Sequence, residues 1–445
     1  MKRLLLTVVA VACAAPAIAA AADLGANGTT MVRFSEQNTP GFDKKTLAPA
    51  TQYLGLSATG LADGNLSLNF YGWGRVDLAD QSTNEGKSDG TVSSAYLRYL
   101  FPKANGELKA GRFFLREGVA RESLDGLLAA ADLPAGFRLA VFGGAPSAIS
   151  LEDDARGDWL AGSRLSLSLG GRSEIGVSYL QAGNSPTQEY SGGTLRTIRD
   201  RRELVGADIW LSPVQAITLN GQTTYNTVTA KVAEHDYNLA IRPLKYLTVT
   251  GNFSERQLKD LFVGTNMPFL FRPDANDKTT NYGGGIVIAT GTPFSLAADY
   301  RHSKRDSYGT TNRFGGEVRY AAEKLFSGGI GYHRVESDAA PVIGPTTPLY
   351  DPSYHEARAW LLLDSGTYSA SLNAIGNFYS DSTHPDLNGQ KTLYEICASA
   401  GFRPAPYLKI SGDVSYGETA FHTSEVKGLV RVEFNTSADS KGGSK

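Results

Sequence analysis

The side chains that could perform catalysis or bind a metal are few and scattered in this 445-residue sequence. Metal sites built from histidine and cysteine need their ligands at short, defined spacings. None of the six histidines has a second histidine or a cysteine at such a spacing. We therefore expect no metal site. The histidines are His235, His302, His333, His355, His384 and His422.

One pair, His422 and Ser424, has the spacing that places a base and a nucleophile on the same face of a strand. That face also carries Val430, Val432 and Phe434, so it is predicted to point toward lipid. We interpret the pair as the polar end of a strand. No catalytic residue is predicted, and we expect that the protein is not an enzyme.

Other candidate sites have simpler explanations. Acidic stretches at Asp274 to Asp277 and Asp351 to Glu356 could bind calcium, but solvated loops are favoured. Cys397 is the one cysteine beyond the first 22 residues, and the chain has no C-x-x-C-H motif for attaching a c-type haem. We therefore expect no disulfide within the mature chain and no cofactor bound by it.

A run of basic residues between positions 75 and 121 is the strongest candidate for a binding surface. Such residues could line the constriction of a channel and favour anions. Acidic neighbours Asp77, Glu107 and Glu117 give an electrostatic field of mixed sign, so plain solvation of these residues in a wet lumen is favoured. The basic residues are Arg75, Arg98, Lys109, Arg112, Arg116 and Arg121.

Charge and composition limit the class of protein. With 43 basic and 45 acidic side chains the net charge is −2, which argues against a nucleic-acid partner. Many glycines (49) and tyrosines (21) with only three methionines favour strands over helices. Beyond the N-terminus no apolar run is long enough for a membrane-spanning helix.

The N-terminus has the pattern of a secretory signal peptide. Met1-Lys2-Arg3 is followed by an apolar run from Leu4 and by the small-residue site Ala17-Ile18-Ala19. We expect residues 1–22 to be removed after export, with cleavage between Ala19 and Asp23. A retained membrane anchor is the less favoured alternative.

Alternating polar and apolar residues predict the strands that must position these side chains. In the segment from Asn65 to Asp77, Leu66, Leu68 and Phe70 share one face. Such segments run about 9 to 13 residues, which suits a tilted crossing of a bilayer. The residues predicted to face the lumen are Asn69, Tyr71, Trp73, Arg75, Asp77, Arg98, Lys109, Asp299 and Arg301.

Short turns and long polar stretches alternate along the chain, as in outer-membrane barrels. Arg242-Pro243-Leu244-Lys245-Tyr246 reappears as Arg403-Pro404-Ala405-Pro406-Tyr407, with a looser copy at Ser212-Pro213. Ten short turns join twenty strands, and strands near Thr29 to Glu36 and His422 to Phe434 close the ring. We predict an all-β, up-and-down antiparallel barrel of 22 strands (range 18–22) over residues 23–434 in the outer membrane. Residues 435–445 would form a disordered periplasmic tail.

Three segments resemble porin-type components of the outer-membrane electron conduits of metal-reducing bacteria. They are Leu66 to Leu78, Leu124-Asp125-Gly126-Leu127 and Phe142-Gly143-Gly144. The resemblance implies a barrel that sheathes multihaem c-type cytochromes on the periplasmic and extracellular sides, with the haems held by those partners. It implies no catalytic residue in this chain.

Barrel size leaves the function open between two main alternatives. Barrels of about 22 strands usually have a filled lumen. Few residues precede the first predicted strand, so either a loop such as Lys259 to Lys278 folds inward or another polypeptide fills the barrel. A conduit sheath and a solute-diffusion porin or substrate channel remain the two candidates, with an outer-membrane hydrolase a distant third. Outer-membrane lipid is the remaining expected partner.

Overall fold

The computed structural model describes the following residues: 23–37, 45–79, 88–147, 158–183, 187–191, 194–198, 201–261, 277–306, 309–322, 325–338, 351–381, 389–418 and 425–436. The expected signal peptide, residues 1–22, lies outside them. So do His384, His422, Ser424 and most of the expected C-terminal tail.

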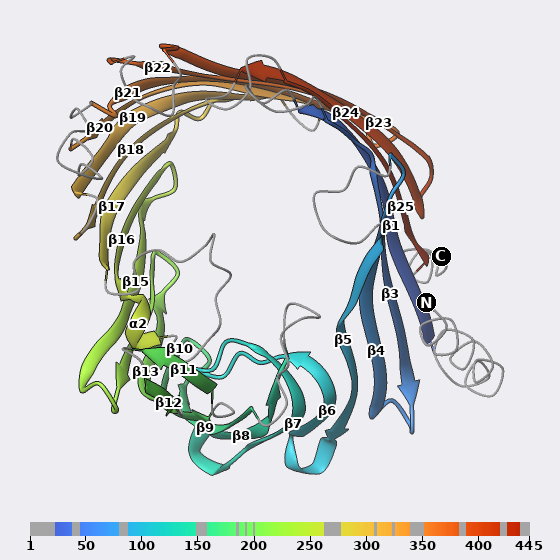
Figure 1. The fold of residues 1–445 in the computed structure, drawn as a ribbon, viewed down its shortest axis with the longest axis vertical. Helices are drawn as coiled ribbons and strands as arrows, with labels where there is room; N and C mark the ends of the chain where they lie inside the picture. The colour runs from blue at the N-terminus through green and yellow to red at the C-terminus, as the bar shows by residue number, and fades with distance from the viewer. Residues whose placement is uncertain are drawn as a thin grey trace.

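Twenty-two antiparallel strands form a closed barrel, which confirms the predicted fold class and strand number. Figure 1 shows them as a ring around a central space. The strands are β1 (Asp23–Gln37), β3 (Pro49–Leu61), β4 (Leu66–Asp77), β5 (Ser88–Phe101), β6 (Gly106–Phe114), β7 (Ser123–Asp132), β8 (Phe137–Pro146), β9 (Trp159–Leu169), β10 (Ser173–Gly183), β13 (Arg201–Val214), β14 (Ile217–Asn226), β15 (Lys231–Leu244), β16 (Leu247–Gln257), β17 (Lys278–Ala289), β18 (Phe294–Arg305), β19 (Gly309–Ala322), β20 (Phe326–Ser337), β21 (Tyr354–Asp364), β22 (Tyr368–Tyr379), β23 (Thr392–Ala405), β24 (Leu408–Glu418) and β25 (Glu425–Asn435).

The remaining elements are small and lie at strand ends. They are β2 (Lys45–Leu47), which pairs with the end of β1, the hairpin of β11 (Thr187–Ser191) and β12 (Thr194–Ile198), the 3-10 turns η1 (Pro102–Ala104) and η2 (Pro134–Gly136), and the one-turn helix α2 (Leu258–Leu261). No helix in the described ranges is long and apolar enough to cross a membrane.

The barrel closes where β1 lies between β25 and β3, so the two ends of the chain meet (Figure 1). β1 begins at Asp23, six residues before the predicted Thr29, because Asp23 to Gly28 pair with β3. β25 runs to Asn435, and the Thr436 hydroxyl accepts a hydrogen bond from the Ala26 amide at 2.9 Å. The wall therefore includes two residues that were predicted to belong to the tail.

Short connections join the strands at one end of the barrel, where the ten short turns were predicted. Three of them share one feature, a register shift beside a proline that lies one residue before the strand ends. Proline has no N–H for the ladder, so a bulge is where a sheet tolerates it. The shifts fall between Leu211 and Val214, Ile241 and Leu244, and Phe402 and Ala405.

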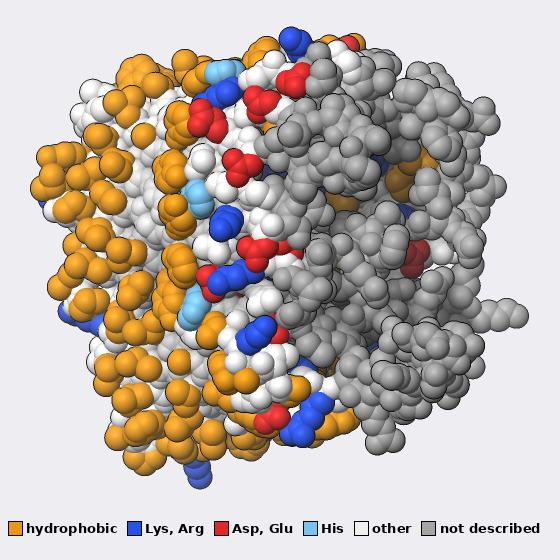
Figure 2. All heavy atoms as spheres, turned by 60° about the vertical axis from the view of Figure 1, so that its left-hand side comes forward, with side chains coloured by type: hydrophobic (Ala, Val, Ile, Leu, Met, Phe, Trp, Pro, Cys, Tyr) orange, Lys and Arg blue, Asp and Glu red, His pale blue; other side chains and the backbone are white. Residues whose placement is uncertain are grey.

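One face of each strand is apolar and points outward. Figure 2 shows this belt as a broad orange zone, next to a band of charged and histidine side chains. In β18, Phe294, Leu296 and Tyr300 are 49%, 46% and 42% exposed although they are large and apolar. An apolar belt bordered by aromatic residues is the outer surface of a membrane barrel.

Candidate functional site: the barrel interior

The inner face of the wall carries most of the side chains that were predicted to face the lumen. Asn69 on β4 pairs with Tyr96 on β5, whereas its neighbour Leu68 pairs with Leu97, which is 46% exposed on the outer face. Because neighbouring side chains in a strand alternate, Asn69, Tyr71 and Trp73 share the inner face. Tyr71 stacks on Tyr53 of β3, with ring centroids 6.4 Å apart.

Charged residues on this part of the inner wall are paired with one another. Glu107 accepts from Arg98 at 2.6 Å and from Lys109 at 3.0 Å. Arg75 lies 3.9 Å from Asp89 on the neighbouring strand. Asp77 differs from the prediction, because it is 5% exposed and its carboxylate accepts hydrogen bonds from the amides of the residues at 48 and 79. It holds the end of β4 and is not open to the lumen.

Arg112 was one of the basic residues that could line a constriction, and the structure places it elsewhere. It pairs with Ala95 and Asp125 in the strand register, on the same face as the exposed Leu97 and Leu127. Its guanidinium makes two hydrogen bonds to Asp125, at 2.6 and 2.7 Å. This ion pair therefore lies on the outer face, near the ends of β6 and β7 that are opposite the short turns.

The connection between β6 and β7 turns into the barrel. We call residues 115–122 the inward hairpin. Its two arms continue the pairing, since the Leu115 amide donates to the Glu122 carbonyl at 2.9 Å. At its tip Glu117 and Ala120 exchange two backbone hydrogen bonds of 3.0 and 3.1 Å. Gly118 has φ +59°, a left-handed conformation that glycine adopts without strain.

The tip of the inward hairpin docks on the inner face of β10 and β13. The Val119 amide donates to the Ser178 hydroxyl at 3.1 Å. Val119 also fills the space that a side chain at position 206 would need. A Cβ added to Gly206 would lie 2.2 Å from Val119 Cγ1. The hairpin thus spans from β6 to the wall several strands away.

Beneath the inward hairpin lies the main buried apolar cluster of the described residues. Leu124, Leu180 and Ala120 are completely inaccessible to solvent. The strands that contribute to it are also apolar on their outer faces, as Leu127 and Val177 show. The space beneath the hairpin is filled by the apolar side chains of this cluster. The cluster consists of Phe113, Leu115, Ala120, Leu124, Leu128, Ala130, Ala140, Phe142, Leu160, Leu180, Ala182 and Leu204.

Ion pairs attach the edge of the hairpin to the wall. Arg202 of β13 bonds to Glu122, and Arg121 bonds to Gln222 of β14. Gln222 donates in turn to Glu234 at 2.7 Å. Arg116, the remaining cation of the hairpin, lies 5.3 Å above the ring of Phe114.

Arg164 of β9 links the other side of the hairpin to the wall through its contacts with acidic residues. Its guanidinium contacts Asp208 at 2.5 Å and Glu174 at 2.6 Å, and it lies 4.0 Å from Glu117. Burial raises the pKa of Glu117 above its ordinary value, and the attraction of Arg164 offsets this only in part. The docked hairpin therefore holds a proton on Glu117 more tightly than a solvated carboxylate would.

Helix α2 adds a second inward contact close to the hairpin (Figure 1). The Asn226 side chain, which is fully buried, donates to the Asp260 carbonyl at 2.7 Å. Arg202 donates to the Leu261 carbonyl at 3.4 Å. The stretch from Lys259 to Lys278, which was one of two alternatives for filling the lumen, thus begins inside the barrel, while residues 262–276 lie outside the described ranges.

A second network lies on the inner face of β18 to β21, away from the hairpin. Arg313 bridges Asp299 and Glu356, at 2.9 Å from each carboxylate. His333 lies 2.9 Å from Asp299 and 3.5 Å from Glu356, with its side chain 9% exposed. Arg301, predicted to face the lumen with Asp299, is exposed in the same wall.

Sequence reasoning missed the inward hairpin and the His333 network. A signal for the hairpin exists: alternation is lost from Leu127 to Ala131, where both faces of β7 are apolar. An inner face without polar groups must be shielded from water in the lumen. The β6–β7 connection, which precedes β7 in the sequence, is the nearest segment that can shield it. No group of three histidine, cysteine or acidic side chains in the described ranges is arranged to hold a metal ion.

Comparison with known proteins relates the chain to large outer-membrane barrels. No protein-family model and no curated protein sequence matches it. Among solved structures it is similar to a mutant of the ferric enterobactin receptor PfeA from Pseudomonas aeruginosa, with a TM-score of 0.56 and 11% identity, covering 93% of this chain and 80% of that one. The siderophore receptor PirA from Pseudomonas aeruginosa matches with a TM-score of 0.52 and 10% identity (92% and 80% covered). The P pilus usher PapC translocation pore matches with a TM-score of 0.50 and 10% identity (93% and 99% covered).

These similarities establish the fold. The chain has the closed, channel-like barrel fold of outer-membrane proteins, and the three similar structures are receptors and a translocation pore, not enzymes.

Proposed function

We propose that this protein is a wide outer-membrane channel that serves as the sheath of an extracellular electron-transfer conduit, with a multihaem c-type cytochrome inside it. The observation that carries the proposal is the width of the barrel. The wall has twenty-two strands, whereas the buried apolar cluster and the tip of the inward hairpin lie against β6 to β13. A barrel of this size is usually filled, and the described residues leave the side bounded by β16 to β25 without a cover of their own.

The charges on the inner wall support a sheath more than an ion-selective pore. Arg98 and Lys109 both pair with Glu107, and Arg313 pairs with Asp299 and Glu356, so each cluster holds charges of both signs. Selectivity filters use rings of charge of a single sign. A wall of paired charges and small polar groups instead presents hydrogen-bonding groups of both kinds, which suits contact with the surface of a folded protein.

One observation favours the alternative, a solute channel. The inward hairpin narrows the lumen, and its Arg121 bonds to Gln222 on the inner wall. A loop folded against the inner wall gives a porin its constriction. In that case the hairpin would set the size and charge of the solutes that pass.

Two measurements on the same preparation separate these functions. Conductance of the purified barrel in a lipid bilayer reports the open lumen, and a haem stain of the native complex reports the partner. A sheath should retain a haem-staining protein and, once stripped of it, should conduct with a large and irregular current. A haem-free protein with a modest, reproducible pore that captures no cytochrome from its host would leave the solute channel as the function.

The hairpin can be tested in the same assay. Deleting residues 116–121 should enlarge the pore of a solute channel several-fold, because the constriction is lost. In a sheath the same deletion should leave capture of the cytochrome intact.

A further inference from the structure

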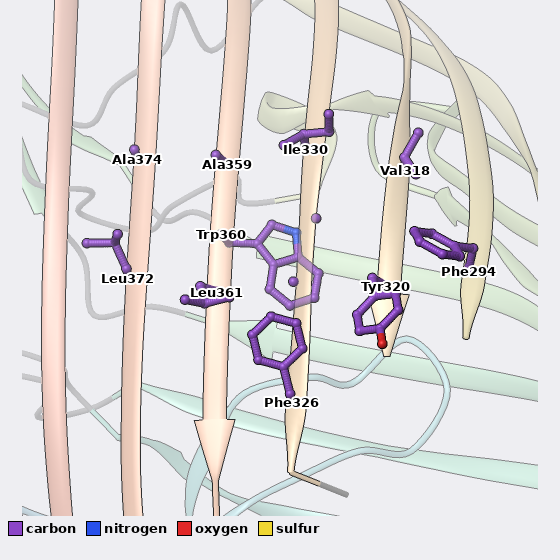
Figure 3. Close-up of a pocket in the computed structure, with 12 residues that line it drawn as sticks. Phe294, Val318, Tyr320, Phe326, Ile330, Ala359, Trp360, Leu361, Leu372 and Ala374 are labelled. Carbon is purple, nitrogen blue, oxygen red and sulfur yellow. The ribbon is translucent and has the colours of Figure 1, made fainter. Parts of the chain in front are cut away.

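An apolar groove runs across the outer face of β18 to β22, near their short-turn ends. Figure 3 shows its lining, which comes from five neighbouring strands. Its volume is about 430 Å³. Its floor is formed by the small residues Gly328, Ala359 and Ala374, of which Ala359 and Ala374 are cross-strand partners. The large side chains around the floor are Phe294, Val318, Tyr320, Phe326, Ile330, Leu361 and Leu372.

Aromatic rings form the end of the groove that lies toward the short turns. Tyr320 packs edge-on against Phe294 and Phe326, with ring centroids 4.9 and 5.7 Å apart. In Figure 3 the Tyr320 hydroxyl points toward that end and away from the groove. Tyrosine sits where an apolar surface meets a wet one, so the rings mark the membrane boundary on the short-turn, periplasmic side.

At the floor the barrel wall is only one backbone thick. The indole of Trp360 lies on the inner side of Gly329, since a Cβ at Gly329 would be 2.8 Å from its ring nitrogen. That nitrogen donates to Glu317 at 2.6 Å, and Glu317 is also held by Arg319 at 2.8 Å. The Trp360 ring therefore covers the inner side of the wall at Gly329, and its hydrogen bond to Glu317 fixes it directly beneath the groove.

We propose that this groove is a binding site for one acyl chain of a phospholipid in the periplasmic leaflet of the outer membrane. The groove is continuous with the apolar belt in Figure 2 and is lined by apolar side chains. Its aromatic end fits the level of the headgroup, and its floor leads from there toward the middle of the belt. Because Gly328 has no side chain, the acyl chain can approach the barrel backbone there. It gains van der Waals contacts that a convex wall does not offer.

The site rests on the proposed placement of the barrel in a membrane, and the test separates the two. The chain has four tryptophans, Trp73, Trp159, Trp210 and Trp360, so variants with a single tryptophan are made by replacing the other three with Phe. Each is inserted into phospholipid vesicles whose acyl chains carry bromine, which quenches tryptophan at short range. Trp159 is 45% exposed on the outer face and reports membrane insertion. Trp73, on the inner face, is the control for a tryptophan with no groove behind it.

We expect the Trp360 protein to lose several-fold more fluorescence than the Trp73 protein, although both rings lie on the inner face. Filling the floor with Ala359→Leu should reduce quenching of Trp360 to the Trp73 level and leave quenching of a Trp159 protein unchanged. Equal quenching of Trp360 with and without Ala359→Leu overturns the groove proposal while the membrane placement stands. Absence of quenching at Trp159 overturns the membrane placement and the groove together. If Ala359→Leu instead dissociates an oligomer in light scattering, this face packs on a second copy of the chain and the lipid site is wrong.

Discussion

Val119 occupies the space that a side chain at position 206 would need. The two residues are far apart in sequence, yet an ideal Cβ on Gly206 would approach Val119 Cγ1 to 2.2 Å. This contact fixes where the inward hairpin meets the inner face of β13. Because of this contact, the docking of the hairpin can be tested by adding a single methyl group at position 206.

Gly206→Ala should displace the inward hairpin. Overpacking of this kind costs about 1 to 3 kcal/mol, and the tip can relieve it by leaving the wall. We expect larger and more variable bilayer conductance than in the wild type. The double variant Gly206→Ala/Val119→Ala restores the space between these two residues. Its conductance should therefore return toward the wild-type value. If both proteins conduct like the wild type, the hairpin does not shape the open lumen.

Arg164→Leu should lower the stability of the barrel. Asp208 and Glu174 would lose their shared cation and repel each other on a wall where Arg164 itself is only 14% exposed. We expect a loss of about 2 to 3 kcal/mol in denaturant unfolding, less than for a fully buried pair because Glu174 is partly solvated. Arg112→Leu is the matched control. Its pair with Asp125 is exposed on the outer face, and such pairs contribute less than about 1 kcal/mol. Similar losses for the two variants would contradict this account of the interior.

Docking of the inward hairpin should depend on pH through Glu117. Because burial raises the pKa of this carboxyl, the docked hairpin binds its proton more tightly than the released one does. This contribution is fully present below the ordinary carboxyl pKa and is lost as pH rises through the raised one. Glu117→Gln removes the titration. The difference between wild type and variant in the frequency of high-conductance excursions should therefore grow as pH rises through that window. A difference that is constant with pH would show that Glu117 does not titrate on docking.

The sequence predicts the wall well and the interior poorly, for a physical reason. Alternation and turn chemistry are local, so the belt and the ten short turns follow from neighbouring residues. The inward hairpin depends on Ser178 and Gly206, which are distant in sequence, and no local pattern at Val119 indicates them. The position of Arg112 on the outer face likewise follows from its cross-strand pairing with Asp125. A charged residue type by itself predicts a lumen-facing position.

Two adjacent alanines in the middle of β18 point to opposite faces of the wall. Ala298 lies on the outer face between Leu296 and Tyr300, and it pairs with Ile286 of β17. Ala297 lies on the inner face and pairs with Glu317 of β19. Arginine on the lipid face near the middle of a bilayer costs about 2 to 4 kcal/mol, whereas on the inner face it meets water and a carboxylate.

Ala298→Arg should therefore reduce the free energy of unfolding in lipid vesicles by about that amount, and Ala297→Arg should change it by less than about 1 kcal/mol. The two variants share the strand, the depth and the size of the change, so the difference between them isolates the face. In detergent micelles, which deform around a charge more easily than a bilayer, the gap should shrink. Equal losses in vesicles would mean that the outer face of β18 does not contact lipid, and the membrane placement of the barrel would fail with it.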